Sequence, residues 1–372
     1  MITFCPDKFG FYQVGNRSTY SKLEAFEWMQ AEKTTAEWNF NRSVFDSLEW
    51  TKEPDTDLWT MYKLRARQIR EAYDYVVLFY SGGSDSHNIL HAWLDAGLKI
   101  DEIATTWNYE ATGDKQNHYN AEITNVVLPD IEELQKKHEF KFRLIDISPL
   151  CIELFDVWGN EFDYNVNFHF SPNNPAKHLF RDKIEDYKNL IAAGKKVCFV
   201  WGKEKPILRY EDGKHYFQFC DNIDNTVGPY VQRKYYQGWY DELFYWSPDF
   251  PLIPVKQSHV VLNYIEHALE SDFEEKSRPF HVNGYSKKYN KYLKDEVIKT
   301  ILYPRWSNDI FCNGKTSSFT YSIRDEWFLL SNLDLKRKFI SITNSYFSKA
   351  DPLNVQQRRN IVPQYSPKYW IK

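Results

Sequence analysis

Six consecutive residues, Ser81-Gly82-Gly83-Ser84-Asp85-Ser86, combine the side chains and the backbone freedom that a polyphosphate site needs. Adjacent glycines let a chain turn sharply, so that successive backbone N–H groups can face one anion. The serine hydroxyls can donate hydrogen bonds to phosphate oxygens. Asp85 would repel such an anion unless a cation lay between them, and Mg²⁺ takes both carboxylate and phosphate oxygens as ligands. The segment therefore predicts a loop that binds a metal-bound polyphosphate.

The segments on either side of this loop predict a strand and a helix. Tyr75–Tyr80 is a continuous apolar run of β-branched and aromatic residues, which is typical of a strand buried on both faces of a parallel sheet. His87–Ala96 predicts a helix that ends at Gly97, and the N-terminus of a helix favours bound anions. An ordinary glycine-rich turn between a strand and a helix is the alternative.

The same alternation of strand and helix continues along the chain. Further strands are predicted at Ile100–Trp107, Phe140–Ile147 and Val197–Trp201. Further helices are predicted at Leu58–Tyr73, at Tyr119–His138 (offset near Pro129) and at Ala176–Ala193. Strands that alternate with helices form parallel βαβ units. The expected fold is therefore α/β, with a doubly wound parallel sheet whose ligands lie beyond the carboxyl ends of its strands.

The pattern changes beyond residue 206. Ile207–Tyr210 and His215–Phe219 predict a hairpin, because the Asp-Gly pair between them tolerates positive φ. Residues 220–255 are aromatic and irregular, and helices are predicted at Val260–Leu269 and Lys291–Leu302. We expect an N-terminal extension over 1–57, an α/β nucleotide-binding domain over 58–206, and a mostly helical, aromatic-rich substrate-binding region over 207–372.

The composition argues against a disordered, a membrane-spanning or a secreted protein. The 372 residues are 42% apolar and 26% charged with a net charge of −4, which suits a folded chain without general attraction to nucleic acid or anionic lipid. No apolar stretch approaches the roughly 18–20 residues of a membrane span, and no basic-then-apolar block predicts secretion. The five cysteines contain no Cys-x-x-Cys pair. These features predict a cytoplasmic protein with reduced thiols.

The loop resembles the PP-loop of the N-type ATP pyrophosphatases, whose motif is Ser-Gly-Gly-x-Asp-Ser. This family includes the synthetase domain of asparagine synthetase, GMP and NAD synthetases, and the queuosine-pathway and tRNA-thiolating enzymes. The resemblance implies an adenine nucleotide alpha hydrolase-like fold over residues 74–206, with ATP and Mg²⁺ as cofactors. It is confined to the loop and to the order of strands and helices around it.

The resemblance also implies roles for individual positions. Asp85 and Lys203 are the expected catalytic residues, and Asp85 and Glu204 the expected metal ligands; a plain surface lysine is the alternative for Lys203. The end of the second strand, with Thr106, is expected to approach the adenine. The residues expected to bind ATP are Ser81, Gly82, Gly83, Ser84, Asp85, Ser86, Trp107, Asn108 and Gly202.

Enzymes of this family cut ATP between its α and β phosphates. An acceptor oxygen attacks the α-phosphorus, pyrophosphate leaves, and a nitrogen or sulfur nucleophile then displaces AMP. Residue 2 is Ile2, where an N-terminal-nucleophile glutaminase would have cysteine, and neither a four-cysteine cluster nor a cysteine pair for sulfur transfer is present. Elimination therefore favours an amide- or C–N-forming ligase that receives ammonia or an amine, free or from a partner protein.

The acceptor is expected to bind beyond residue 206. Asp249, Lys256 and His259 concentrate polar groups among aromatic residues, and the last two share a face if they lie on a helix. A packed aromatic loop followed by a helix start is the alternative. The segments that alternate cations with rings, and could stack the bases of a nucleic acid, are Arg233–Trp239 and Tyr289–Tyr292, with Arg358 and Arg359 nearer the C-terminus.

Three functions therefore stay open. The leading one is an ATP-dependent ligase that adenylates a carboxylate or carbonyl of a small molecule or nucleobase. The second is an enzyme of the same chemistry that modifies bases of tRNA or DNA, by thiolation or amidation. The third is a regulatory protein that binds the nucleotide without turnover.

Overall fold

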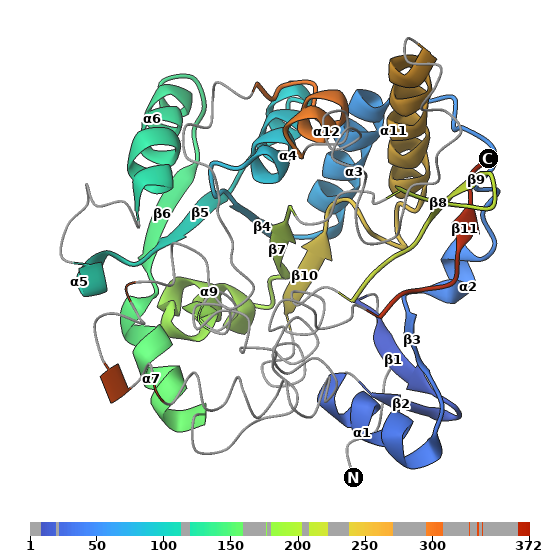
Figure 1. Ribbon diagram of the computed structural model, residues 1–372. Helices are drawn as coiled ribbons and strands as arrows, with labels where there is room; N and C mark the ends of the chain where they lie inside the picture. Colours follow the sequence, from blue (N-terminus) through green and yellow to red (C-terminus); the bar gives the residue numbers. More distant parts are fainter. Residues whose placement is uncertain are drawn as a thin grey trace.

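A five-stranded parallel sheet forms the centre of the protein (Figure 1). The computed structural model describes residues 9–19, 22–112, 120–158, 176, 180–202, 208–221, 238–270, 295–307, 327, 333, 334, 337 and 364–372. The strand order is β10-β7-β4-β5-β6. These strands are β4 (Tyr75–Phe79), β5 (Glu102–Trp107), β6 (Lys141–Asp146), β7 (Val197–Trp201) and β10 (Trp239–Leu243).

The sheet is doubly wound, as the sequence predicts. β4 comes first along the chain and lies in the middle; β5 and β6 are added on one side of it, and β7 and β10 on the other. Figure 1 shows α4 (Ser84–Asp95) and α6 (Leu128–Gln135) on one side of the sheet. It shows α7 (Ser148–Trp158) and α9 (Glu185–Ala192) on the other side.

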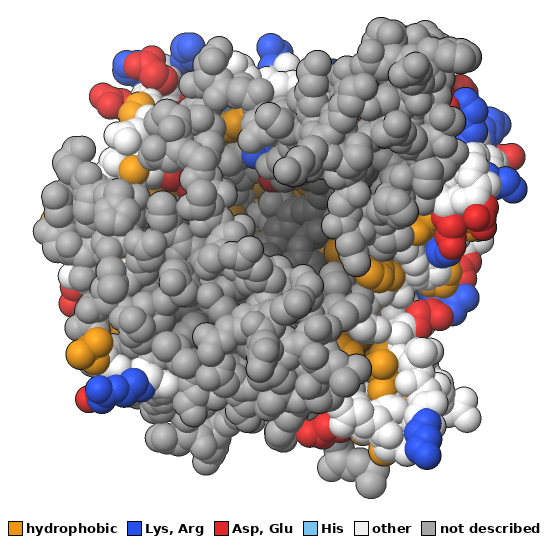
Figure 2. All heavy atoms as spheres, viewed as in Figure 1, with side chains coloured by type: hydrophobic (Ala, Val, Ile, Leu, Met, Phe, Trp, Pro, Cys, Tyr) orange, Lys and Arg blue, Asp and Glu red, His pale blue; other side chains and the backbone are white. Residues whose placement is uncertain are grey.

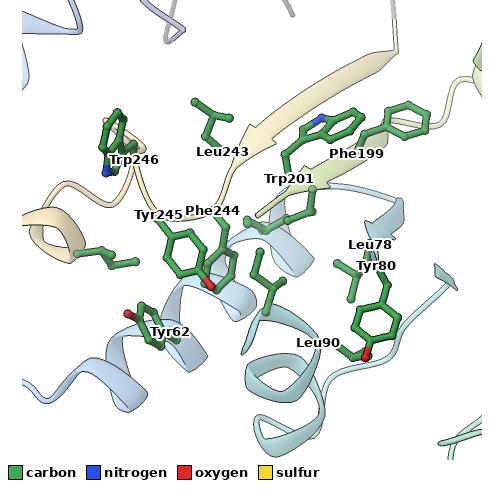
Figure 3. Close-up of a cluster of buried hydrophobic side chains, with 14 of the residues drawn as sticks. Tyr62, Leu78, Tyr80, Leu90, Phe199, Trp201, Leu243, Phe244, Tyr245 and Trp246 are labelled. Carbon is green, nitrogen blue, oxygen red and sulfur yellow. The ribbon is translucent and has the colours of Figure 1, made fainter. Parts of the chain in front are cut away.

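The core lies between the central strands and the helices that cover them. The side chains of β7 are buried on both faces, which explains its continuous apolar sequence. Phe79 at the end of β4 stacks on Trp201 at the end of β7, with ring centroids 4.0 Å apart. Figure 3 shows Leu78 and Leu90 in the same apolar cluster as Trp201 and Leu243.

Three helices flank the sheet around α4. In α3 (Leu58–Ala72), Asp57 caps the N-terminus by accepting a hydrogen bond from the Thr60 N–H at 2.9 Å. This helix packs on α4 and on α11 (Leu252–Glu270), which begins eight residues earlier than the predicted Val260. The third, α12 (Asp295–Leu302), packs against α11 and matches the later part of its prediction.

The fifth strand corrects the sequence prediction. Residues 220–255 were expected to be irregular, but Trp239–Leu243 forms β10 in parallel register with β7. Its two central acidic residues, Asp241 and Glu242, are buried in the sheet. Each is paired with a buried arginine from elsewhere in the chain, Arg181 and Arg65 respectively. The sheet therefore takes a strand from the range that the sequence assigns to the C-terminal region.

Two predicted helices differ in detail. The helix expected over Ala176–Ala193 is shorter: the described part contains a 3₁₀ turn at Phe180–Lys183 followed by α9. The offset expected near Pro129 is confirmed, because a π-helical segment at Ile123–Val127 precedes α6.

Two small antiparallel sheets complete the described structure. The first contains β1 (Phe11–Val14), β2 (Arg17–Thr19) and β3 (Ala36–Asn39), beside α1 (Lys22–Glu32). The predicted hairpin is confirmed as β8 (Leu208–Glu211) and β9 (Lys214–Phe217), which pair with the C-terminal β11 (Tyr369–Trp370). The two short helices are α2 (Arg42–Phe45) and α5 (Tyr109–Thr112).

The described part of the C-terminal region is mixed. It contributes strands as well as α11 and α12, so the expectation of a mostly helical region is met only in part. None of the helices in the described ranges is long and apolar enough to cross a lipid bilayer.

Candidate functional site

The Ser81–Ser86 loop lies where the winding of the sheet reverses. It follows β4, whose neighbours β5 and β7 lead the chain in opposite directions. In open α/β sheets, the crevice outside the carboxyl ends of the strands at this switch point is the usual place for a ligand. The position of the loop therefore agrees with its predicted role.

The backbone of the loop requires glycine at Gly82. Its φ is +74°, and a Cβ atom there would lie 3.0 Å from Cγ2 of Val127 and 3.2 Å from Cγ1 of Val126. A side chain would thus be both strained and crowded. The turn brings the chain directly into α4.

Helix α4 begins inside the motif rather than after it. Its first residue is Ser84, three residues before the predicted start at His87. Gly83 is the N-cap and provides no side-chain hydrogen bond to the first turn. Because the first N–H groups of a helix have no intrahelical acceptor, this uncapped start is suited to an anion.

Gly202 lies against the same turn from β7. A Cβ atom on Gly202 would lie 2.8 Å from Cδ1 of Ile89 and 3.1 Å from the Asp85 carbonyl carbon and the Ser86 nitrogen. Only glycine allows this close approach of β7 to α4. The structure thus places Gly202 beside the loop, where it is in close van der Waals contact with α4.

The serines of the loop have different environments. Ser86 Oγ accepts a hydrogen bond from the Ser81 N–H at 3.1 Å and donates one to the Gly83 carbonyl at 3.0 Å, so this hydroxyl closes the loop on itself. Ser84 is buried, and its hydroxyl has no hydrogen-bond partner among the described residues. Ser84 is therefore the hydroxyl that still requires a partner.

Asp85 is half-buried at the start of α4 and is held by tyrosine hydroxyls. Tyr303, just beyond α12, donates to Asp85 Oδ1 at 2.5 Å. Tyr245, just beyond β10, donates to the Asp85 backbone carbonyl at 2.9 Å. Neither contact is predicted by the sequence, because both tyrosines are more than 150 residues from Asp85 along the chain.

Tyr80, His87 and Asp130 form a second cluster beside the loop, which the sequence did not predict. Tyr80 precedes Ser81, and its hydroxyl lies 3.2 Å from Nδ1 of His87, which follows Ser86. The same hydroxyl donates to Asp130 of α6. Burial lowers the pKa of His87 to about 4, and His91 adds to this lowering while Asp130 opposes it. His87 is therefore neutral near pH 7, and the cluster holds both ends of the loop.

The other residues predicted to bind the nucleotide are placed as follows. Trp107, the last residue of β5, is buried and stacks on Tyr109 with ring centroids 4.8 Å apart. The Asn108 N–H donates to Oδ1 of Asn120 at 3.3 Å. Trp107 and Asn108 lie at the same edge of the sheet as the loop, because the carboxyl ends of parallel strands share one edge. Lys203 and Glu204 lie outside the described residues.

The residues predicted to bind the acceptor are not brought together at the loop by any contact in the described ranges. Lys256 and His259 share one face of α11, as predicted. Lys256 pairs with Glu53 at 2.7 Å, and Nε2 of His259 lies 2.9 Å from the Trp50 carbonyl oxygen. Asp249 is exposed. Their role in substrate binding stays a prediction.

The cation-rich aromatic segments predicted to contact nucleic acid fall almost wholly outside the described residues. Trp239, the last residue of one of them, belongs to β10 and is buried. Figure 2 shows acidic and basic side chains of described residues side by side around the edge of one face.

The loop fits a metal-bound polyphosphate. The start of α4 has no side-chain cap, Gly82 adopts a positive φ, and the buried Ser84 hydroxyl has no hydrogen-bond partner among the described residues, all of which are compatible with phosphate oxygens as ligands. The described ranges contain no cluster of three His, Cys, Asp or Glu residues that could hold a metal by themselves. Mg²⁺ is usually held by one or two carboxylates together with the phosphates of the substrate, and Asp85 can supply such a carboxylate.

No sequence-family profile matches the chain, and no curated protein matches it. Among solved structures, the chain is similar to the crystal structure of NAD+ synthetase from Burkholderia pseudomallei, with 12% sequence identity and a TM-score of 0.28. The likeness covers 72% of this chain and 89% of the synthetase chain.

Proposed function

We propose that this protein binds ATP with Mg²⁺ at the Ser81–Ser86 loop and uses it to adenylate an acceptor, as PP-loop ATP pyrophosphatases do. The observation that supports the proposal is the uncapped start of α4 within the motif, at the switch point of the sheet. The N–H groups of this first turn are fixed before a ligand arrives. Fixed donors aimed at developing charge are an efficient way to stabilise a leaving group.

The residues of the loop have distinct tasks in this proposal. The α4 N-terminus and the Ser84 hydroxyl bind the pyrophosphate portion of ATP, while Ser86 keeps the loop closed around it. Asp85 holds the metal, which offsets the negative charge of the phosphates. Trp107 and Asn108, at the end of β5, lie where the adenine is expected.

The chemistry then needs no protein nucleophile. A carboxylate or carbonyl oxygen of the acceptor attacks the α-phosphorus, and the bond to the β-phosphate oxygen breaks with release of pyrophosphate. Ammonia or an amine next attacks the activated carbon, loses a proton, and expels AMP. We propose a ligase of the C–N-forming type, with its nitrogen supplied from solution or by a partner protein.

The test is product analysis with candidate carboxylate and nucleobase acceptors. The proposal predicts AMP and pyrophosphate in equal amounts, dependent on Mg²⁺ and acceptor. Formation of ADP and phosphate would contradict it. Tight ATP binding without acceptor-dependent turnover or exchange of pyrophosphate into ATP would instead favour a regulatory nucleotide-binding protein.

Asp85→Asn tests the proposed metal ligand. The amide keeps the shape of the side chain and removes its charge, so we expect turnover to fall by about 100-fold or more, equivalent to about 2.7 kcal/mol. Steady-state AMP release measures the change. Glu133→Gln is the control, since Glu133 is exposed on α6 and pairs with Lys136. Wild-type turnover in Asp85→Asn would remove Asp85 from its role.

A further inference from the structure

The contacts of Asp85 come from two segments distant in the sequence. Tyr303 and Tyr245 are both fully buried, at 0% exposure. One donates to the Asp85 carboxylate and the other to its main-chain carbonyl. The Tyr245 hydroxyl also accepts a hydrogen bond from Nδ2 of Asn88, one turn further along α4, at 3.0 Å. Both the backbone and the side chain of Asp85 are thus fixed from outside its own helix.

Both tyrosines remain hydrogen-bond donors at neutral pH. A phenol hydroxyl titrates at about pH 10, so each tyrosine keeps its proton at neutral pH. A protonated hydroxyl orients a carboxylate without neutralising its charge, whereas an arginine or lysine at the same place would offset that charge. The arrangement therefore suits a carboxylate that has to attract a cation.

The segment that carries Tyr303 is attached along the length of α4. Arg305 pairs with Asp95, the last residue of the helix. The Trp306 ring lies edge-on to His87 in its first half, with centroids 5.7 Å apart. These contacts fix the position of Tyr303 relative to α4.

We propose that Tyr303 is the positioning residue for Asp85: its hydroxyl holds the carboxylate in the rotamer that receives the metal of a bound nucleotide. The inference rests on the proposed function and extends it to the 303–306 segment, which lies far beyond the motif. Outer partners that orient a metal-binding side chain typically change metal affinity by about 10- to 100-fold when they are removed.

The experiment compares Tyr303→Phe with a matched control, Tyr187→Phe. Tyr187 is a fully buried residue of α9, whose hydroxyl donates to the Glu102 carboxylate at 2.5 Å, away from the loop. Both variants lose one buried hydroxyl and keep the ring, so their losses of stability should be similar. ATP binding is measured by calorimetry at increasing Mg²⁺ and in EDTA, and urea unfolding of each variant is measured alongside.

We expect Tyr303→Phe to need a Mg²⁺ concentration about 10-fold or more above that of wild type for half-maximal enhancement of ATP binding. Its affinity for ATP in EDTA, without Mg²⁺, should change little. Tyr187→Phe should stay within about 2-fold of wild type in both conditions. Equal or lower Mg²⁺ requirement in Tyr303→Phe would overturn the inference while leaving the proposed function intact. If Tyr303→Phe lost as much ATP affinity in EDTA as in Mg²⁺, the role of Tyr303 would be purely structural, and the inference would also be overturned. Failure of the wild-type protein to bind ATP with Mg²⁺ would reject the proposed function itself.

Should Tyr303→Phe fail to fold, Arg305→Gln provides the second variant. Arg305 and Asp95 form a partly exposed pair at the far end of α4, so the substitution loosens the segment without altering the hydroxyl. The inference then predicts a smaller increase in the Mg²⁺ requirement, of about 2- to 5-fold, again with unchanged binding in EDTA. An unchanged Mg²⁺ requirement would contradict it.

Discussion

Acidic side chains in β10 and at the start of α4 have different kinds of partner. In β10, Asp241 and Glu242 are almost completely buried, and each faces an arginine that is equally buried. At the start of α4, Asp85 is half-buried and faces tyrosine hydroxyls. The difference separates carboxylates that hold the fold together from the one that we propose to be positioned for a ligand.

The β10 pairs are completed by further hydrogen bonds. Arg181 reaches both oxygens of Asp241 at 2.9 and 3.0 Å, and the Trp201 indole N–H donates to the same carboxylate at 2.6 Å. The guanidinium also lies 4.4 Å from the centroid of the Phe199 ring. Removing one partner of this buried ion pair should strongly lower the free energy of unfolding, because the other partner would be left as an unpaired buried charge.

The largest effect is expected from breaking this pair. Arg181→Met should lower the free energy of unfolding by about 3–5 kcal/mol, because Asp241 would be left buried without its cation. Urea unfolding measures the change. Lys183→Met, two residues away, removes an exposed pair with Glu153 and should cost less than about 1 kcal/mol. Similar losses in the two variants would abolish the distinction between buried pairs and surface charges.

Acid should lower the stability of the protein through His87, beside the loop. The pKa of His87 is about 4 in the folded protein, against 6.5 for an ordinary histidine. As the pH falls from 6.5 towards 4, the unfolded chain therefore binds a proton that the folded protein does not. Stability should decrease over this range by up to about 3 kcal/mol and be highest above pH 6.5.

Unfolding experiments between pH 7 and pH 4 measure this dependence. His87→Phe should reduce the pH dependence over that range, since one of the buried histidines no longer titrates. His267→Gln is the control, because His267 is exposed on α11 and should leave the dependence unchanged. An undiminished acid sensitivity in His87→Phe would show that other groups cause it.

A smaller effect is expected from filling the space between β7 and α4. Gly202→Ala should cost about 1–3 kcal/mol, because Ile89 and the backbone of Asp85 must move to accommodate the new methyl group. It should also weaken ATP binding by about 10-fold through displacement of the loop. Calorimetry and urea unfolding measure the two effects.

Gly97→Ala provides the control for this substitution. Gly97 ends α4 far from the loop, with φ +66° and open space around it, so its replacement strains the backbone without crowding. We expect lower stability and unchanged ATP affinity. If Gly202→Ala also left ATP affinity unchanged, the contact of Gly202 with α4 would have no part in nucleotide binding.

The central strands could be predicted from sequence because they are uniformly apolar. Val197–Trp201 forms β7 with the predicted bounds, and Tyr75–Phe79 forms β4 with its end one residue earlier. β10 escaped prediction because its Trp-Tyr-Asp-Glu-Leu sequence places two charges inside the sheet. Those charges are tolerated only because Arg65 and Arg181 neutralise them, and these partners lie 177 and 60 residues away.

The same reason limits what could be predicted of the candidate site. The loop motif is local, so its glycines and its place between β4 and α4 follow from adjacent residues. The tyrosines that hold Asp85 come from segments 160 and 218 residues further along the chain. No local periodicity indicates such contacts, which arise only when α12 and the end of β10 pack against α4.

The central claim is that the loop at the start of α4 binds the phosphates of a nucleotide. A crystal structure with Mg²⁺ and a non-hydrolysable ATP analogue, methylene-bridged between the α and β phosphates, tests it most directly. We predict phosphate oxygens within hydrogen-bond distance of the first-turn N–H groups and of the Ser84 hydroxyl, with the metal between Asp85 and the phosphates. An analogue bound elsewhere, with these groups facing only water or protein, would contradict the account.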